Sequence, residues 1–203
     1  MKKLKIFATS DLQGNSVVSK QLASRAEKEH ADVVIIAGDI LDFGQYQKNI
    51  IKPFVEKNER VLIVPGNHDT EDSIENFEKN YSVKNLHGNY VIIGDVGFFG
   101  CGGTSMPLFN YALSEEEIYK KLKKSFEKVK DMPKKVMVTH IHPSGGFVEK
   151  FTFPGSKGVR KAIDQFKPDV HISGHIHEME GAEEKMGKTL VISVGARGKV
   201  VEL

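Results

Sequence analysis

Continuous apolar runs, each ended by a short polar cluster, recur along this chain and restrict the folds open to it. The runs at 32–37, 61–64 and 136–139 carry few polar side chains, which is typical of strands buried on both faces of a parallel sheet. Segments 17–30 and 45–57 precede the first two of these runs and are predicted to be helices, although a proline disturbs the second. This alternation predicts parallel βαβ units and an α/β fold, in which ligands bind beyond the carboxyl ends of the strands.

Turn signals divide the middle and the end of the chain. Short runs between 83 and 100 are broken by Gly88-Asn89 and by Gly94-Asp95, and both pairs predict hairpin turns. From 178 to 203 the pattern predicts short antiparallel strands. No repeat, low-complexity tract or linker interrupts the chain, so residues 1–203 are predicted to form a single domain.

Two further helices are predicted in the second half of the chain. Ser114-Glu115-Glu116-Glu117 has the capping-box pattern and predicts a helix that runs to about Lys130. Segment 158–166 is the second, and it follows a loop at 141–157 that is rich in Gly, Pro and Phe. This loop either packs on the surface or overhangs the cleft beyond the strand ends and helps to select a ligand.

Composition narrows the class of protein. Hydrophobic residues make up 39% of the chain and charged residues 28%, which are ordinary values for a globular domain in water. The formal net charge of +2 provides no global attraction to nucleic acid or to an acidic membrane. Cys101 is the single cysteine, which excludes an intramolecular disulfide, and no stretch approaches the roughly 18 apolar residues of a membrane helix. We therefore expect a cytoplasmic protein without a membrane segment.

Five polar clusters follow apolar runs and contain the candidate functional residues. They are Asp11-Leu12-Gln13, Gly38-Asp39-Ile40-Leu41-Asp42, Gly66-Asn67-His68-Asp69, Thr139-His140 and Gly174-His175-Ile176-His177. If the sheet is largely parallel, all five clusters come to the same edge. Such a set of carboxylates, imidazoles and an amide is costly to bury without a counter-charge. Divalent cations supply that charge, and mixed Asp, His and Asn ligands suit Mn, Fe or Zn.

Each cluster alone also has an ordinary structural explanation. A Gly-Asp pair after a strand is commonly a turn or a helix cap, and an isolated Thr-His pair is commonly structural. His175 and His177 are more specific, because alternate residues of an extended segment share a face and could reach neighbouring metal ions. The occurrence of all five clusters in this order makes coincidence a weak explanation.

The five clusters resemble the signature of the calcineurin-like metallophosphoesterase family, which reads Asp-x-His, Gly-Asp-x-x-Asp, Gly-Asn-His-Asp/Glu, His and Gly-His-x-His. The resemblance extends from Asp11 to His177. Stretches 100–104 and 154–156 are also similar to a small prokaryotic branch related to cyclic-nucleotide phosphodiesterases. The resemblance implies a four-layer α/β/β/α sandwich with two central mixed sheets.

The resemblance also implies a dinuclear metal centre that holds Mn, Fe, Zn or Ni, with Mn favoured. Its implied ligands are Asp11, Gln13, Asp39, Asn67, His140, His175 and His177. Asp11 and His177 would hold the first ion. Asn67, His140 and His175 would hold the second, and Asp39 would bridge the two.

The implied activity is hydrolysis of a phosphodiester or phosphomonoester bond by a hydroxide that bridges the two metal ions. His68 would act as the general acid or stabilise charge on the leaving oxygen. Asp42 would orient His68 through a hydrogen bond. No protein nucleophile is needed, and Cys101 is interpreted as a packing residue.

The chain departs from the family pattern at Gln13, where the family has histidine. An amide oxygen is neutral and a weaker ligand than imidazole, so the first site is expected to be weaker or to prefer Mn or Mg over Zn. Gln13 could instead bond to a bound water. The alternative function is therefore a catalytically weakened binding or scaffold protein on the same fold.

The expected partner is a small phosphoester substrate. The basic segments 120–124 and 128–135 are most simply the solvated face of a helix that begins with acidic residues. A nuclease is the third alternative, but the chain has no room for extra DNA-contacting domains, so nucleic acid is disfavoured. An apolar hairpin at Val96–Gly100 could pair with a second copy, so self-association stays open.

Overall fold

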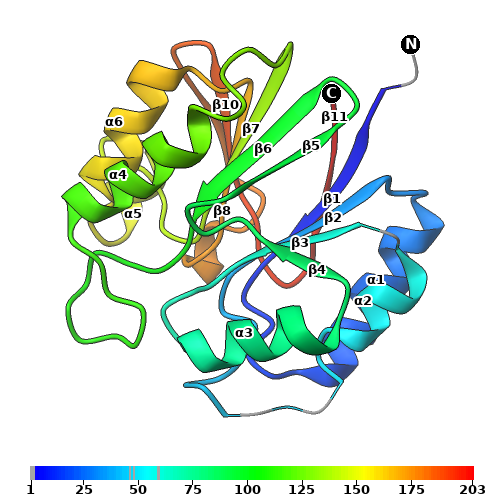
Figure 1. Ribbon diagram of the computed structural model, residues 1–203. Helices are drawn as coiled ribbons and strands as arrows, with labels where there is room; N and C mark the ends of the chain where they lie inside the picture. The colour runs from blue at the N-terminus through cyan, green and yellow to red at the C-terminus, as the bar shows by residue number, and fades with distance from the viewer. Residues whose placement is uncertain (1–2, 46, 48, 59) are drawn as a thin grey trace.

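The computed structural model describes residues 3–45, 47, 49–58 and 60–203 (Figure 1). Two β-sheets pack together with helices on their outer faces, which confirms the predicted four-layer α/β/β/α sandwich. The helices beside the first sheet are α1 (Ser16–Lys28), α2 (Lys52–Lys57) and α3 (Glu71–Asn80). Those beside the second sheet are α4 (Glu115–Phe126), α5 (Phe147–Phe151) and α6 (Lys157–Phe166).

Both sheets have a parallel centre and at least one antiparallel edge strand, as expected for mixed sheets. The order in the first sheet is β11 (Lys199–Glu202), β1 (Lys5–Thr9), β2 (Val33–Ala37), β3 (Val61–Val64) and β4 (Val83–Asn85). Only β11 runs antiparallel to its neighbour there. The order in the second sheet is β5 (Tyr90–Ile93), β6 (Val96–Cys101), β7 (Lys134–Thr139), β8 (Val170–Ser173), β10 (Thr189–Ser193) and β9 (Glu183–Met186). There the outer strands β5 and β9 are antiparallel to their neighbours.

Burial on both faces explains the continuous apolar runs of the central strands. In β2, Val33, Ile35 and Ala37 belong to the hydrophobic core between the two sheets. Val34 and Ile36 point the other way and pack against helices α1, α2 and α3, which cover the first sheet. Because alternate residues of a strand face opposite sides, both sets must be apolar.

The second predicted helix is shorter than expected. Within the predicted range 45–57 the helix is α2, and residues 46 and 48 lie outside the described part of the chain. Pro53 lies in the first turn of α2, where a missing N–H leaves no helical hydrogen bond unmade. The proline therefore begins this helix and does not disturb it.

Helix α4 begins at the predicted capping box, in which Ser114 and Glu117 exchange side-chain and backbone hydrogen bonds. It ends at Phe126, before the predicted end near Lys130. The predicted loop at 141–157 is not wholly irregular, because it contains the short helix α5.

One of the two predicted hairpins is confirmed and the other is wrong. Gly94-Asp95 joins the antiparallel strands β5 and β6. Gly88-Asn89 instead carries the chain from β4 in the first sheet to β5 in the second. The prediction for 178–203 is partly wrong for the same reason, since β10 is parallel to β8 and β11 crosses to the first sheet. Local turn signals do not specify which strands pair.

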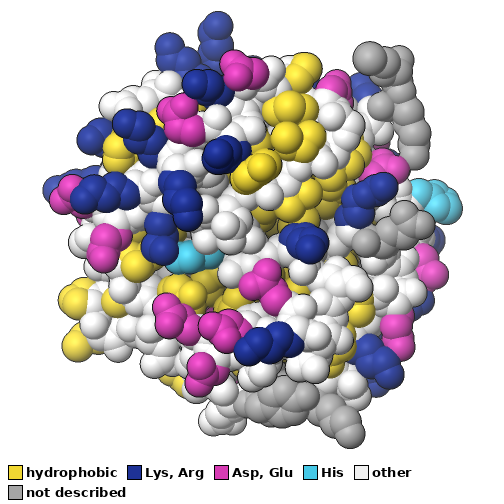
Figure 2. All heavy atoms as spheres, viewed as in Figure 1, with side chains coloured by type: hydrophobic (Ala, Val, Ile, Leu, Met, Phe, Trp, Pro, Cys, Tyr) yellow, Lys and Arg dark blue, Asp and Glu magenta, His cyan; other side chains and the backbone are white. Residues whose placement is uncertain are grey.

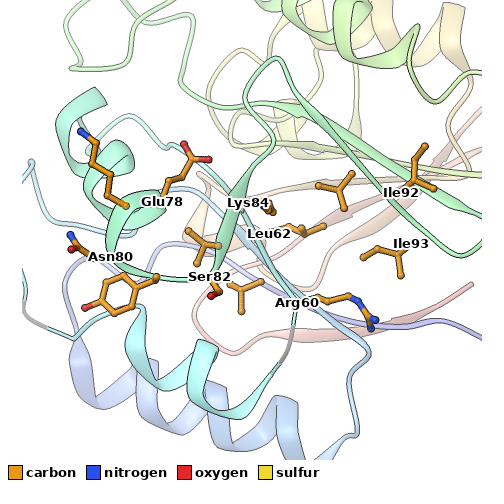
Figure 3. Close-up of a pocket in the computed structure, with 13 residues that line it drawn as sticks. Arg60, Leu62, Glu78, Asn80, Ser82, Lys84, Ile92 and Ile93 are labelled. Carbon is orange, nitrogen blue, oxygen red and sulfur yellow. The ribbon is translucent and has the colours of Figure 1, made fainter.

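The edge strands β4 and β5 lie at the same side of the molecule and border a hollow of about 700 Å³ (Figure 3). The predicted exposed hairpin at Val96–Gly100 is wrong, because every residue of β6 is buried. Tyr90 and Ile92 on β5 are exposed instead, and hydrophobic side chains gather over this strand (Figure 2). Among the described residues, no helix is long and apolar enough to cross a lipid bilayer.

Candidate metal centre

The five polar clusters lie beyond the carboxyl ends of strands from both sheets. Strands β1, β2 and β3 precede the clusters that contain Asp11, Asp39 and Asn67. Strands β7 and β8 of the second sheet precede His140 and His175. The prediction placed the clusters at the edge of one sheet, whereas two sheets contribute, and side-chain contacts join the two contributions.

The centre of the site is a buried group of three side chains. Asp11, Asp39 and His140 each place one potential ligand atom within 4.8 Å of the others. Oδ1 of Asp11 is buried and accepts no hydrogen bond from a described residue. Two buried carboxylates here face one imidazole, so an additional cation would relieve the cost of burying them. The donor set and the orphaned oxygen therefore fit a divalent metal ion.

His140 is held on both sides of its ring. Its Nδ1 donates to the carbonyl oxygen of Ala37 at 2.8 Å. Its Nε2 lies 2.9 Å from Oδ1 of Asn67 and 3.4 Å from Oδ1 of Asp39. Burial opposes the charged ring, but the charge and hydrogen bond of Asp39 outweigh it and raise the pKa of His140 to about 9. A backbone carbonyl on Nδ1 is the arrangement that turns Nε2 of a histidine toward a metal ion.

Asp39 lies where the loops after β2 and β3 meet. Burial alone would raise the pKa of Asp39, but His140 and the backbone N–H of His68, 2.9 Å from Oδ1, lower it to about 2. The backbone at residue 66 approaches closely, since a Cβ on Gly66 would lie 2.0 Å from Oδ1 of Asp39. The glycine of this cluster is therefore required to admit the carboxylate.

His175 and His177 do not lie on an extended segment, contrary to the prediction. His175 has a φ of 75°, and His177 begins a 3₁₀ helix, η1 (His177–Met179). The backbone N–H of His175 donates to Oδ2 of Asp11 at 3.2 Å, and its ring centroid is 5.1 Å from that of His140. Burial and the charge of His140 lower the pKa of His175 to about 3, so its ring is neutral and able to act as a ligand.

The side of the site around His177 is more open to water. The His177 side chain is 52% exposed, and its Nε2 lies 3.4 Å from Oδ1 of Asp11. This close approach of the Asp11 carboxylate raises the pKa of His177. Nε2 of Gln13 lies 3.4 Å from Nε2 of His177, which places the Gln13 amide beside this imidazole. Rotation of the amide would bring its oxygen to the same position.

His68 is positioned by ring stacking. Its ring lies 3.9 Å from that of Phe43 at an interplanar angle of 24°, and Phe109 stacks more distantly at 6.2 Å. Nε2 of His68 faces Oδ2 of Asp39 at 3.9 Å. Nδ1 faces Oδ1 of Asp42 at 3.6 Å, which is longer than a hydrogen bond. At this separation the two side chains do not share the hydrogen bond expected from the sequence.

Two residues have contacts that the sequence analysis did not assign. Phe43 stacks on His68, and no pattern in the sequence predicted this contact. Asp69 is fully buried and accepts hydrogen bonds from the backbone N–H groups of Ile40, Leu41 and Gly66. Burial and the charge of Asp39 raise the pKa of Asp69 to about 6. Asp69 thus links the loop after β2 to the loop after β3. Its place at the end of the Gly-Asn-His-Asp cluster was the sequence signal that could have predicted this link.

Three other side chains with reactive or charged groups lie outside the group of candidate metal ligands. His142 is buried, with Nε2 3.1 Å from the carbonyl oxygen of Phe153. Arg197 is exposed, and its guanidinium faces Glu180. Cys101 is buried, which raises the pKa of its thiol to about 12, in accord with a packing role.

Residues 4–179 match the family model described as calcineurin-like phosphoesterase. An uncharacterized protein of Methanocaldococcus jannaschii is 33% identical over 204 residues, which cover 95% of this chain and 88% of that protein. A crystal structure of a protein from Thermus thermophilus has a TM-score of 0.79 at 18% identity and covers 100% of this chain and 99% of its own. A structure described as a novel archaeal phosphodiesterase has a TM-score of 0.53 at 18% identity, covering 98% and 99%. At these identities the two structures show the shared fold.

Proposed function

This chain belongs to the calcineurin-like phosphoesterase family, and from this we propose that it is a metal-dependent hydrolase of small phosphodiesters or phosphomonoesters. One observation carries the proposal. Asp11, Asp39 and His140 bring two carboxylates and one imidazole together in a buried site, and one carboxylate oxygen there has no hydrogen-bond partner among the described residues. A divalent cation is the ligand whose charge and coordination suit this group.

Seven side chains would hold two divalent ions. We assign Asp11, Gln13 and His177 to the first ion, Asn67, His140 and His175 to the second, and Asp39 to both. When bound, the ions would supply positive charge to the phosphate oxygens and lower the pKa of a bound water. We propose Mn²⁺ as the favoured ion because Gln13 offers a neutral oxygen where an imidazole would favour Zn²⁺.

The surrounding residues prepare His140 for this role. The carbonyl of Ala37 accepts from Nδ1, so Nε2 is the nitrogen left for a metal ion. Nε2 now faces the oxygens of Asn67 and Asp39, and the high pKa means that it carries a proton at neutral pH. Metal binding therefore requires His140 to release that proton, so affinity should rise with pH.

His68 is our candidate for proton transfer to the leaving oxygen. Stacking on Phe43 fixes the plane of its ring, and Asp42 on the Nδ1 side leaves Nε2 turned toward Asp39 and the buried cluster. A proton on Nε2 would therefore face a phosphoester held beside Asp39. The dry contact with Phe43 also shields one face of the imidazole from water.

A second candidate function rests on Gln13. The amide replaces the usual imidazole at the exposed side of the centre, where it lies beside His177. If one ion were too weakly held, the fold could serve as a binding or scaffold protein. Retention of Asp39, His68 and both imidazoles of the Gly-His-x-His cluster favours the enzyme.

Hydrolysis of bis-p-nitrophenyl phosphate with added Mn²⁺ tests the proposal. We expect metal-dependent turnover that disappears in chelator and in Asp39→Asn. Asp95→Asn is the matched control, because this exposed aspartate lies in the β5–β6 turn and should retain full activity. Absence of turnover with Mn²⁺, Mg²⁺, Fe²⁺, Ni²⁺ and Zn²⁺ would favour the binding or scaffold function.

A further inference from the structure

An apolar hollow of about 740 Å³ lies beside the candidate centre. The residues that line it are Phe147, Phe151, Thr152, Phe153, Glu178 and Met179. Three phenylalanines within seven residues are 44%, 68% and 63% exposed here, and the rings of the first two lie 4.9 Å apart at an interplanar angle of 56°. Large exposed apolar groups that gather in one place commonly mark a binding surface.

Two routes through the structure join this hollow to the candidate centre. Glu178 and Met179 belong to η1, the short helix that begins at His177. The carbonyl of Phe153 is bonded to His142, whose ring is stacked 6.2 Å from that of His175. A molecule bound at the two histidines of the Gly-His-x-His cluster would therefore have this hollow as its neighbour.

The loop that carries the phenylalanines is fixed by specific contacts. Oε1 of Glu184 accepts from the backbone N–H of Phe147 at 2.6 Å. The carboxylate of Glu149 accepts from the N–H groups of Gly145 and Gly155, which ties both ends of α5 together. These hydrogen bonds fix the conformation of the loop, so the fold itself holds the phenylalanine rings at the surface.

The chemistry of the hollow selects against highly charged substrates. None of the six described residues that line it is basic, and Glu178 would repel a second phosphate. Among the described residues, the other phenylalanine that is more than half exposed is Phe43, which covers His68. Apolar surface therefore borders the candidate centre at both His68 and His177.

On the basis of the function proposed above, we infer that the hollow binds an apolar group of the substrate. The substrate class is then a phosphoester with an alkyl or aryl substituent, whose phosphate lies at the candidate centre. Polyphosphate nucleotides are disfavoured because the hollow offers no cation to a second phosphate. A volume of about 740 Å³ falls in the usual range for small-molecule sites.

The first test uses phosphodiesters with p-nitrophenol as the constant leaving group and varies the length of the alkyl group on the second ester bond. Methyl, butyl and octyl p-nitrophenyl phosphates are hydrolysed with Mn²⁺, and kcat/KM is compared. We expect kcat/KM to rise about two- to fourfold per added methylene up to butyl, since each buried methylene contributes a similar factor. Phe151→Ser and Phe153→Ser should each lower the ratio of kcat/KM for the butyl ester to that for the methyl ester at least fivefold. Equal kcat/KM for all three esters in the wild-type protein would overturn the inference.

Ile92→Ser is the matched control. Ile92 is a 47% exposed apolar side chain that lines the other hollow, between β4 and β5 (Figure 3). That hollow contains Val61 and Leu62 of β3, so it lies at the end of this strand opposite to Asn67. The control should keep the butyl preference, and its loss would show that the preference does not arise at the phenylalanines.

A second readout separates this inference from the proposed function. The metal-free protein in chelator is titrated with N-phenyl-1-naphthylamine, whose fluorescence rises in apolar sites; the chain has no tryptophan to interfere. We expect saturable binding that octyl phosphate displaces and that weakens at least fivefold in Phe151→Ser but not in Ile92→Ser. Probe binding without hydrolysis of any ester would support the hollow while contradicting the enzyme. Hydrolysis without probe binding or chain-length preference would contradict the hollow alone.

Discussion

His140 is fully buried at one side of the candidate centre, whereas His177 on the other side has half of its side chain in water. Both imidazoles face an aspartate, at Nε2–oxygen distances of 3.4 Å. The buried pair has no water to replace a lost partner, so removal of one charge leaves the other uncompensated. Water reaches the His177 imidazole of the other pair, although its partner Asp11 is buried. The same chemical change should therefore have different consequences on the two sides.

This difference explains where the chain departs from the family pattern. Gln13 lies at the exposed side, beside His177, where water can reach a ligand that holds an ion weakly. On the buried side, Asp39, Asn67 and His140 match the family pattern. A side chain at position 66 would collide with Asp39, so this side has little room for other residues.

The largest effect is expected from His68→Ala. His68 contacts Asp39 of the buried side without lying among the assigned metal ligands, so its loss should lower kcat about 10²–10⁴-fold while the bound metal changes little. Activity against bis-p-nitrophenyl phosphate and metal content after gel filtration are the two measurements. Parallel loss of metal and activity would make His68 a ligand. Phe43→Leu should have a milder effect, about tenfold, because it removes only the stacked ring.

A direct comparison of the two sides is His140→Ala against His177→Ala in the metal-free protein. Removal of His140 leaves Asp39 buried without its partner, and we expect a loss of about 3 kcal/mol in the free energy of unfolding. Removal of His177 should cost less than about 1 kcal/mol because water replaces it. Urea unfolding in chelator measures both, and equal losses would remove the distinction between the sides.

The pH dependence of stability should reveal the buried side. The pKa of His140 is about 9 in the folded protein and 6.5 in the reference state, so the folded state binds more protons between these values. The contribution of His140 to the free energy of unfolding of the metal-free protein should thus be complete below pH 6.5 and fall, by on the order of 2 kcal/mol, as pH rises to 9. His140→Ala should remove most of this slope, and His177→Ala should keep it.

The other buried histidines act in the opposite direction and at lower pH. Burial lowers the pKa of His87 to about 4 and those of His171 and His175 to about 3. These three reduce stability as pH falls through 6.5, so the fall in stability above about pH 7.5 reports His140. Saturating Mn²⁺ should reverse the trend above pH 6.5, because deprotonated His140 binds the ion more tightly. A slope that is identical with and without Mn²⁺ would show that His140 is not a ligand.

Much of the architecture was predictable because its signals are local or periodic. The apolar runs of β2 and β3 identified strands buried on both faces, and their polar ends predicted where the candidate site lies. The path through Gly88-Asn89 was not predictable, because a turn signal does not report that the chain changes sheets there. The stacking of Phe43 on His68 and the positive φ of His175 arise from contacts between loops that are distant in sequence.

The smallest expected effect lies at the exposed side, in Gln13→His. An imidazole at this position should raise the affinity for one of the two ions about tenfold, since it is a better ligand than a neutral amide. Competition titration with a chromogenic chelator measures that affinity. Gln21→His, on the exposed face of α1, is the matched control for a surface histidine.

Unchanged affinity in Gln13→His would mean that residue 13 does not reach an ion. Destabilisation of the metal-free protein by more than about 1 kcal/mol would mean that this side is not as tolerant as its exposure indicates.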